Sequence, residues 1–135
     1  MKKLFLFLAL VIFLGLNINA NAQSVSLIVC ERYGTYGPEG VGDSFTPGYL
    51  TVVAYGTSAM YYGQVYIQYD KLDANGQYYL YKKFAFDFPN GYKTVYFSRT
   101  GNNDMEFNHT GYYRVFLLDK YGNSIAYTTV SIVNW

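Results

Sequence analysis

Apolar and polar residues alternate with a period of two along most of the chain after residue 23, and this pattern constrains the fold more than any other feature. Successive side chains of a β-strand point to opposite faces, so the alternation predicts strands that are buried on one side. In the segment 60–70, the odd-numbered residues from Tyr61 to Tyr69 include Val and Ile, whereas Gln64 and Gln68 hold even positions. We expect the odd-numbered face of this strand to meet the core. No segment after residue 23 has the 3.6-residue period of a helix.

Turn residues divide this pattern into short strands. Gly and Pro cluster in 34–48, which predicts a long loop. Two Asp-x-x-Gly sequences, at 73–76 and 119–122, predict tight hairpins in which Gly76 and Gly122 adopt a left-handed backbone. The seven expected strands are 24–30, 49–55, 60–70, 78–88, 92–99, 112–119 and 124–133.

Residues 1–22 have the organisation of a signal peptide. Lys2 and Lys3 precede an apolar run over 4–16, and Ala20-Asn21-Ala22 is a small-x-small cleavage site. The apolar run is too short to span a bilayer comfortably, and no Cys follows it directly to accept a lipid. We therefore expect cleavage near Ala22 and secretion to the periplasm or the extracellular space, without membrane insertion.

The remaining chain, 23–135, is long enough to bury one core, so we expect a single domain. Short strands separated by turn signals are typical of an antiparallel sandwich, and the absence of helices excludes a parallel α/β fold. The sequence therefore predicts an all-β, seven-stranded antiparallel β-sandwich with no significant helix after removal of the signal peptide.

The segment 109–115, His-Thr-Gly-Tyr-Tyr-Arg-Val, resembles the start of strand F in immunoglobulin-like domains. The resemblance extends over about 92–133 and is to the immunoglobulin-like modules of bacterial extracellular proteins, because no partner Cys and no Trp in the third strand are present. It implies an immunoglobulin-like or fibronectin-like sandwich. It also implies that Tyr113 is a corner tyrosine, whose hydroxyl closes the turn before its own strand. It implies no chemistry.

Composition excludes several classes of function. The chain has one His and one Cys, which cannot form a Cys/His zinc site, and no spacing of acidic residues selects a catalytic pair. Loss of Lys2 and Lys3 with the signal peptide leaves eight basic and nine acidic residues, which is no footprint for nucleic acid. We expect no catalytic residues, no cofactor and no nucleic-acid partner.

Two weaker features concern metals and thiols. Asp104 and Glu106 lie in an oxygen-rich loop over 101–108 and are weak candidates for calcium ligands, with solvation of the loop as the alternative. Cys30 ends the first expected strand in phase with Ser26, and it is either buried as a small apolar residue or paired between molecules.

The 17 tyrosines are the most informative surplus, because other apolar residues largely supply the expected core. Tyrosine offers a flat ring with a hydroxyl, a combination used in surfaces that bind proteins and glycans. We expect a secreted binding or adhesion module that recognises a glycan or protein through loops and an aromatic platform. The alternative is that tyrosine is simply a good strand former. The candidate ligand-binding residues are Tyr62, Tyr66, Tyr78, Tyr79 and Tyr81.

Two other functions remain open. The segment 124–135 carries no charge, so an edge strand there could pair with a second copy and make a self-associating structural protein. Tyr-rich strands and the terminal Trp135 are also compatible with a small outer-membrane barrel, although an odd number of strands and Lys82 on an apolar face oppose it.

Overall fold

The computed structural model describes residues 24–101 and 105–134, which form twelve strands and no helix. The protein is therefore all-β, as expected. Each of the seven expected strands has a counterpart of similar length: β1 (Val25–Cys30), β6 (Thr51–Met60), β7 (Gln64–Leu72), β8 (Tyr78–Asp87), β9 (Tyr92–Phe97), β11 (Gly111–Asp119) and β12 (Ser124–Ile132).

The expectation of a continuous loop over 34–48 was wrong. The five further strands are short: β2 (Arg32–Gly34), β3 (Gly37–Glu39), β4 (Ser44–Phe45), β5 (Gly48–Tyr49) and β10 (Glu106–Phe107). The first four of these lie in or beside this segment. Gly and Pro marked the turns correctly, but the residues between the turns lie against strand edges, where their backbone groups find partners.

The expectation of a purely antiparallel fold was also wrong, because β4 pairs with the end of β12 in parallel. The amides of Ser131 and Val133 donate to the carbonyl oxygens of Asp43 and Phe45, both at 2.8 Å. A strand of two residues leaves no alternating signal in a sequence, so this pairing could not be read from periodicity.

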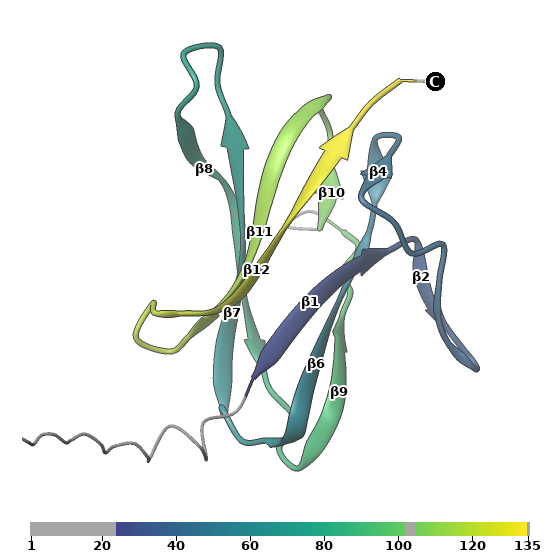
Figure 1. Ribbon diagram of the computed structural model, residues 1–135, viewed down its shortest axis with the longest axis vertical. Coiled ribbons are helices and arrows are strands. Elements are labelled where there is room, and N and C mark those ends of the chain that lie inside the picture. Colours follow the sequence, from purple (N-terminus) through teal and green to yellow (C-terminus); the bar gives the residue numbers. More distant parts are fainter. Residues whose placement is uncertain (1–23, 102–104, 135) are drawn as a thin grey trace, which may run out of the picture.

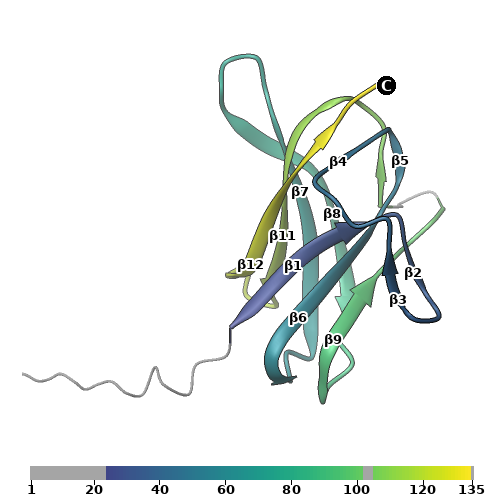
Figure 2. The same cartoon turned by 45° about the vertical axis from the view of Figure 1, so that its right-hand side comes forward.

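Two sheets contain the long strands. One has the order β1-β6-β9, and the other has the order β4-β12-β11-β7-β8. Figures 1 and 2 show that β1 and β12 approach each other where the sheets meet, and that the β7–β8 hairpin projects beyond the other strands. The two remaining sheets are the hairpin β2-β3 and the pair β10-β5.

Buried side chains of both sheets form one hydrophobic cluster, which includes Leu27 and Val52 from one sheet and Ile67 and Val115 from the other. On β7 the odd-numbered face is buried, as the alternation predicts. Tyr61 does not follow this rule and is 70% exposed. It precedes β7 and lies in the turn around Gly63, whose φ of 76° breaks the strand geometry.

The β2–β3 hairpin packs on the outer side of the three-stranded sheet. The rings of Tyr33 and Tyr96 stack with centroids 4.4 Å apart and planes 8° apart. Cys30 and Thr51 face each other across β1 and β6 on this outer side, and both are buried. Cys30 therefore has the phase of a surface residue but is covered by a segment of the chain that follows it.

Candidate functional site

The five candidate tyrosines do not form one platform. Tyr66 and Tyr78 lie on the outer side of the five-stranded sheet. Tyr66 alternates with buried residues of β7, and Tyr78 pairs with Leu72, which has the same phase as Tyr66. Tyr79 and Tyr81 line a pocket on the opposite side of the β7–β8 hairpin. Tyr62 packs against the core, with its ring 5.4 Å from that of Phe88 in an edge-on arrangement.

A register shift in β8 contributes to this separation. Tyr69 pairs with Lys82 and Asp70 pairs with Leu80, so Tyr81 is an extra residue that forms a β-bulge. Beyond the bulge, Tyr78 continues on the outer side and Tyr79 on the inner side. The sequence analysis missed this because a single inserted residue reverses which positions share a face.

The outward side chains of four adjacent strands form a surface that we call the aromatic face. Tyr112 and Phe116 come from β11, and Tyr127 from β12, with Tyr112 62% and Tyr127 59% exposed. Together with Tyr66 and Tyr78 they spread across the sheet. The alternation of 112–119 marks Tyr112 and Phe116 as outward residues, so the sequence held a signal for these members.

Cations lie among the rings of the aromatic face. The guanidinium carbon of Arg114 is 3.7 Å from the centroid of the Tyr78 ring and 5.4 Å from that of Phe116. Lys83 Nζ lies 4.6 Å from the centroid of Tyr66. Such cation–aromatic contacts hold a positive charge against the face of a ring.

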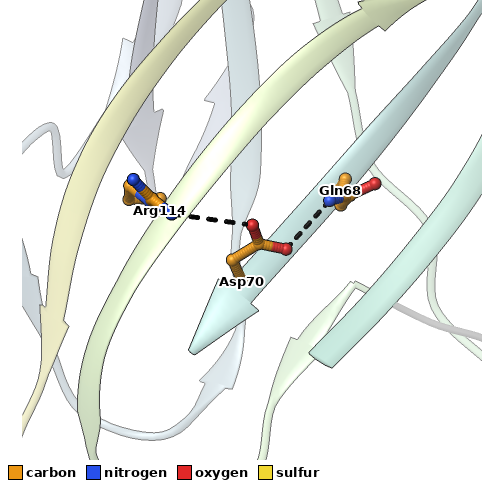
Figure 3. A network of polar contacts seen from close by, with 3 residues as sticks. All are labelled: Gln68, Asp70 and Arg114. Carbon is orange, nitrogen blue, oxygen red and sulfur yellow. Dashed lines mark hydrogen bonds and ion pairs between the residues drawn. The ribbon is translucent and has the colours of Figure 1, made fainter. Parts of the chain in front are cut away.

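Asp70 on β7 forms an ion pair with Arg114 on the neighbouring strand β11 (Figure 3). Gln68 Nε2 donates a hydrogen bond to Asp70 Oδ1 at 2.9 Å, and Arg114 Nη2 lies 4.0 Å from Asp70 Oδ2. Arg114 Nε is shielded from solvent and has no hydrogen-bond partner in the described part of the chain. Arg114 is therefore held mainly by stacking and by a long ion pair, and the sequence analysis did not identify it.

A hollow of about 600 Å³ lies at the edge of the aromatic face. Tyr78 and Tyr112 contribute to it from the face, Ser131 from β12, and Asp43 and Ser44 from the segment that pairs with β12. The face is thus flat over most of its area, with a depression near the point where β4 joins the sheet.

The proposed structural residues are placed as follows. Tyr113 is buried, and its hydroxyl donates to the carbonyl oxygen of His109 at 2.5 Å, which is the contact that a corner tyrosine makes. Gly76 and Gly122 have φ values of 80° and 88°. In both turns the first Asp, Asp73 or Asp119, accepts two backbone hydrogen bonds through its Oδ1 atom.

Of the weak calcium candidates, Asp104 lies outside the described residues. Glu106 Oε1 accepts a hydrogen bond from Asn108 Nδ2 at 3.0 Å. Over residues 24–101 and 105–134, no group of three or more His, Cys, Asp or Glu side chains is arranged to hold a metal ion. Those same residues contain no helix that could cross a bilayer.

Comparison with known proteins does not place the chain in a family. No protein-family model, curated protein or solved structure matches it.

Proposed function

We propose that this protein is an exported binding module that docks another protein through the aromatic face. The observation that carries the proposal is the stacking of Arg114 on Tyr78 at 3.7 Å, in a row of outward rings from four strands. Tyr and Arg, together with Trp, are enriched among the residues that contribute most to protein–protein binding energy.

We also infer that the two larger sheets form an immunoglobulin-like sandwich. Three observations support this: a hydrophobic cluster shared by both sheets, the orders β1-β6-β9 and β12-β11-β7-β8, and the Tyr113 hydroxyl bonded to His109. A rigid sandwich holds a sheet face in a fixed shape, which lowers the entropic cost of docking.

Local chemistry favours a protein partner for this face. The rings lie on an open sheet, and Lys83 and Arg114 place two positive charges among them, with Asp70 near Arg114. A matching partner presents apolar groups opposite the rings and carboxylates opposite Lys83 and Arg114.

Site-specific photo-crosslinking tests this function. The photoreactive amino acid p-benzoylphenylalanine replaces Tyr112 on the face in one protein and Tyr121 in another, since Tyr121 is 78% exposed but lies in the β11–β12 turn. Each full chain is expressed and exported in its own host, and adducts are identified by mass spectrometry. The proposal expects one defined protein adduct at position 112 and none at 121.

The same experiment includes the variant Arg114→Ala as a second control. If this variant loses the adduct at position 112 and its thermal unfolding is unchanged, the result supports recognition through the Arg114–Tyr78 pair. Equal adducts at positions 112 and 121, or an adduct at 112 that survives Arg114→Ala, contradict the proposal.

Self-association is the second candidate, and one observation favours it. β4 covers β12 only at Ser131 and Ile132, and no other described strand pairs with that edge. The N–H groups of Ser131 and Val133 point toward β4, so by the alternation of the strand the N–H of Thr129 points toward the open edge. Strand addition by a second copy at this edge predicts a dimer in light scattering that Thr129→Pro abolishes. A monomer at all concentrations excludes it.

A further inference from the structure

A second hollow lies on the side of the β7–β8 hairpin that faces away from the aromatic face. It has a volume of about 620 Å³, within the range of small-ligand sites. Lys71 and Tyr79 are direct partners across the hairpin and share the phase of buried Tyr69. Tyr69 lies in the core, so Lys71 and Tyr79 lie on the same inner side of the sheet, beyond the end of the core. We call this hollow the hairpin pocket.

Two tyrosine rings form one wall of the hairpin pocket. Tyr79 is 47% exposed, so its ring is available to a ligand. Tyr81 is held in place by three contacts. The backbone N–H of Asn108 donates a hydrogen bond to its hydroxyl oxygen at 3.2 Å, and His109 Nδ1 lies 3.3 Å from the same oxygen. The Tyr81 ring also meets the Tyr113 ring edge-on, with centroids 5.2 Å apart. The β-bulge at Tyr81 turns this ring toward the pocket side. An ordered ring beside an accessible ring is a preformed surface for stacking.

The charged group of the pocket is Lys71. Its Nζ lies 5.8 Å from the centroid of the Tyr113 ring, and no carboxylate of the described residues is within ion-pair distance. A Cβ at Gly111 would come within 3.0 Å of Nζ, so the glycine leaves room for the ammonium group. A cation without a local counterion attracts an anionic ligand.

Most of the remaining lining is polar. Asn108, His109, Thr110 and Asn134 line the pocket together with Pro47, and none of the described residues that line it is acidic. Lys82 supports this wall, since its Nζ donates to the Glu106 carbonyl and to Asn108 Oδ1, both at 2.7 Å. Amides and an imidazole offer donors and acceptors of the kind that hydroxyl groups require.

We propose that the hairpin pocket binds an acidic saccharide, a pyranose that carries a carboxylate. The sugar ring stacks on Tyr79, its hydroxyl groups bond to the side chains of Asn134 and His109, and its carboxylate pairs with Lys71. This site is separate from the aromatic face and does not depend on the protein-docking function proposed above.

Titration of the full chain with tetragalacturonate, followed by amide NMR shifts, tests the proposal. The matched ligand is the fully methyl-esterified tetrasaccharide, which keeps the sugar rings and removes the charge. A second matched ligand is tetraglutamate, which keeps four carboxylates and removes the rings. The expected result is that tetragalacturonate shifts the amides of Lys71, Tyr79 and His109, and that both matched ligands bind at least about tenfold more weakly, as expected for loss of one charged hydrogen bond or one stacking contact.

Variants connect the binding to named side chains. Lys71→Gln and Tyr79→Ala are each expected to weaken tetragalacturonate binding about tenfold. The matched controls are Lys120→Gln and Tyr121→Ala, a lysine and tyrosine in the β11–β12 turn whose Nζ and ring lie 5.2 Å apart. These controls are expected to bind as the unmodified protein does.

Three outcomes overturn the proposal. They are the absence of pocket shifts with tetragalacturonate, equal binding of either matched ligand, and equal effects of the pocket and control variants. Equal binding of tetraglutamate would identify the pocket as a general acidic-peptide site instead. Unchanged dispersion of the other amide signals shows in each variant that a loss of binding is not a loss of folding.

Discussion

The hydroxyl of Tyr113 donates a hydrogen bond to the carbonyl oxygen of His109, four residues earlier in the chain, at 2.5 Å. The ring is fully buried and lies 4.8 Å from Phe107 and 5.2 Å from Tyr81, both edge-on. One side chain thus ties the turn before β11 to the core and to the wall of the hairpin pocket.

The substitution Tyr113→Phe removes this hydrogen bond and keeps the ring. We expect the free energy of unfolding to fall by about 1 kcal/mol, the usual net contribution of one hydrogen bond, because the bond to the His109 carbonyl is lost while the ring keeps its packing. Urea unfolding of the variant measures the loss. Tyr112→Phe is the control, since Tyr112 is 62% exposed, and equal stability of the two variants contradicts this role for Tyr113.

Alkaline pH is expected to destabilise the protein. Burial, together with the neighbouring Tyr81, raises the pKa of Tyr113 well above its ordinary value. The unfolded chain loses this proton near pH 10, whereas the folded chain keeps it. The stabilisation that comes from the raised pKa of Tyr113 is therefore complete below pH 10. Above pH 10, the free energy of unfolding falls by roughly 1.4 kcal/mol per pH unit for this one group.

Urea unfolding between pH 8 and pH 11 measures this dependence. Burial also raises the pKa values of Tyr55 and Tyr62, so some decline remains when Tyr113 is replaced. A shallower decline in Tyr113→Phe is the expected result. An identical decline in both proteins shows that Tyr113 does not contribute.

Cys30 is expected to react slowly with thiol reagents until the β2–β3 hairpin opens. It is fully buried, and burial raises the pKa of its thiol, which lowers the reactive thiolate fraction. Tyr33→Ala removes the stack on Tyr96, and a stacked pair contributes about 0.5–1.5 kcal/mol, so labelling by iodoacetamide is expected to accelerate between about twofold and tenfold.

The matched control for Cys30 labelling is Tyr36→Ala, at the tip of the same hairpin, where the side chain is 100% exposed. This variant is expected to react at the unmodified rate. Rapid labelling of the unmodified protein at pH 8 contradicts the protective role of the hairpin.

Processing of the leader can be measured directly. If 1–22 is a signal peptide, the exported protein begins at Gln23, and its intact mass lacks the first 22 residues. Replacement of Ala20 and Ala22 by Leu is expected to block cleavage, because the peptidase requires small residues there. A mature mass that retains residues 1–22 in the unmodified protein shows that the segment is not a cleaved leader.

Much of the fold followed from local patterns. The alternation located all seven long strands, and the two Asp-x-x-Gly turns located the hairpins around Gly76 and Gly122. The candidate site followed only in part. Tyr66 and Tyr78 do share the aromatic face, but Tyr79 and Tyr81 turn to the other side because of the bulge at Tyr81. A bulge depends on the partner strand and has no separate signal in the alternation.

The sequence by itself determined which residues form strands and which of them alternate on one face, since both depend on chemistry over a few neighbouring positions. Only the tertiary structure decided which faces are covered. Cys30 alternates like a surface residue, yet the β2–β3 hairpin buries it, and Arg114 reaches Tyr78 only because β7 lies between β11 and β8. Coverage arises from contacts between segments far apart in the chain, and these contacts depend on how the whole chain minimises exposed apolar area and unpaired backbone groups.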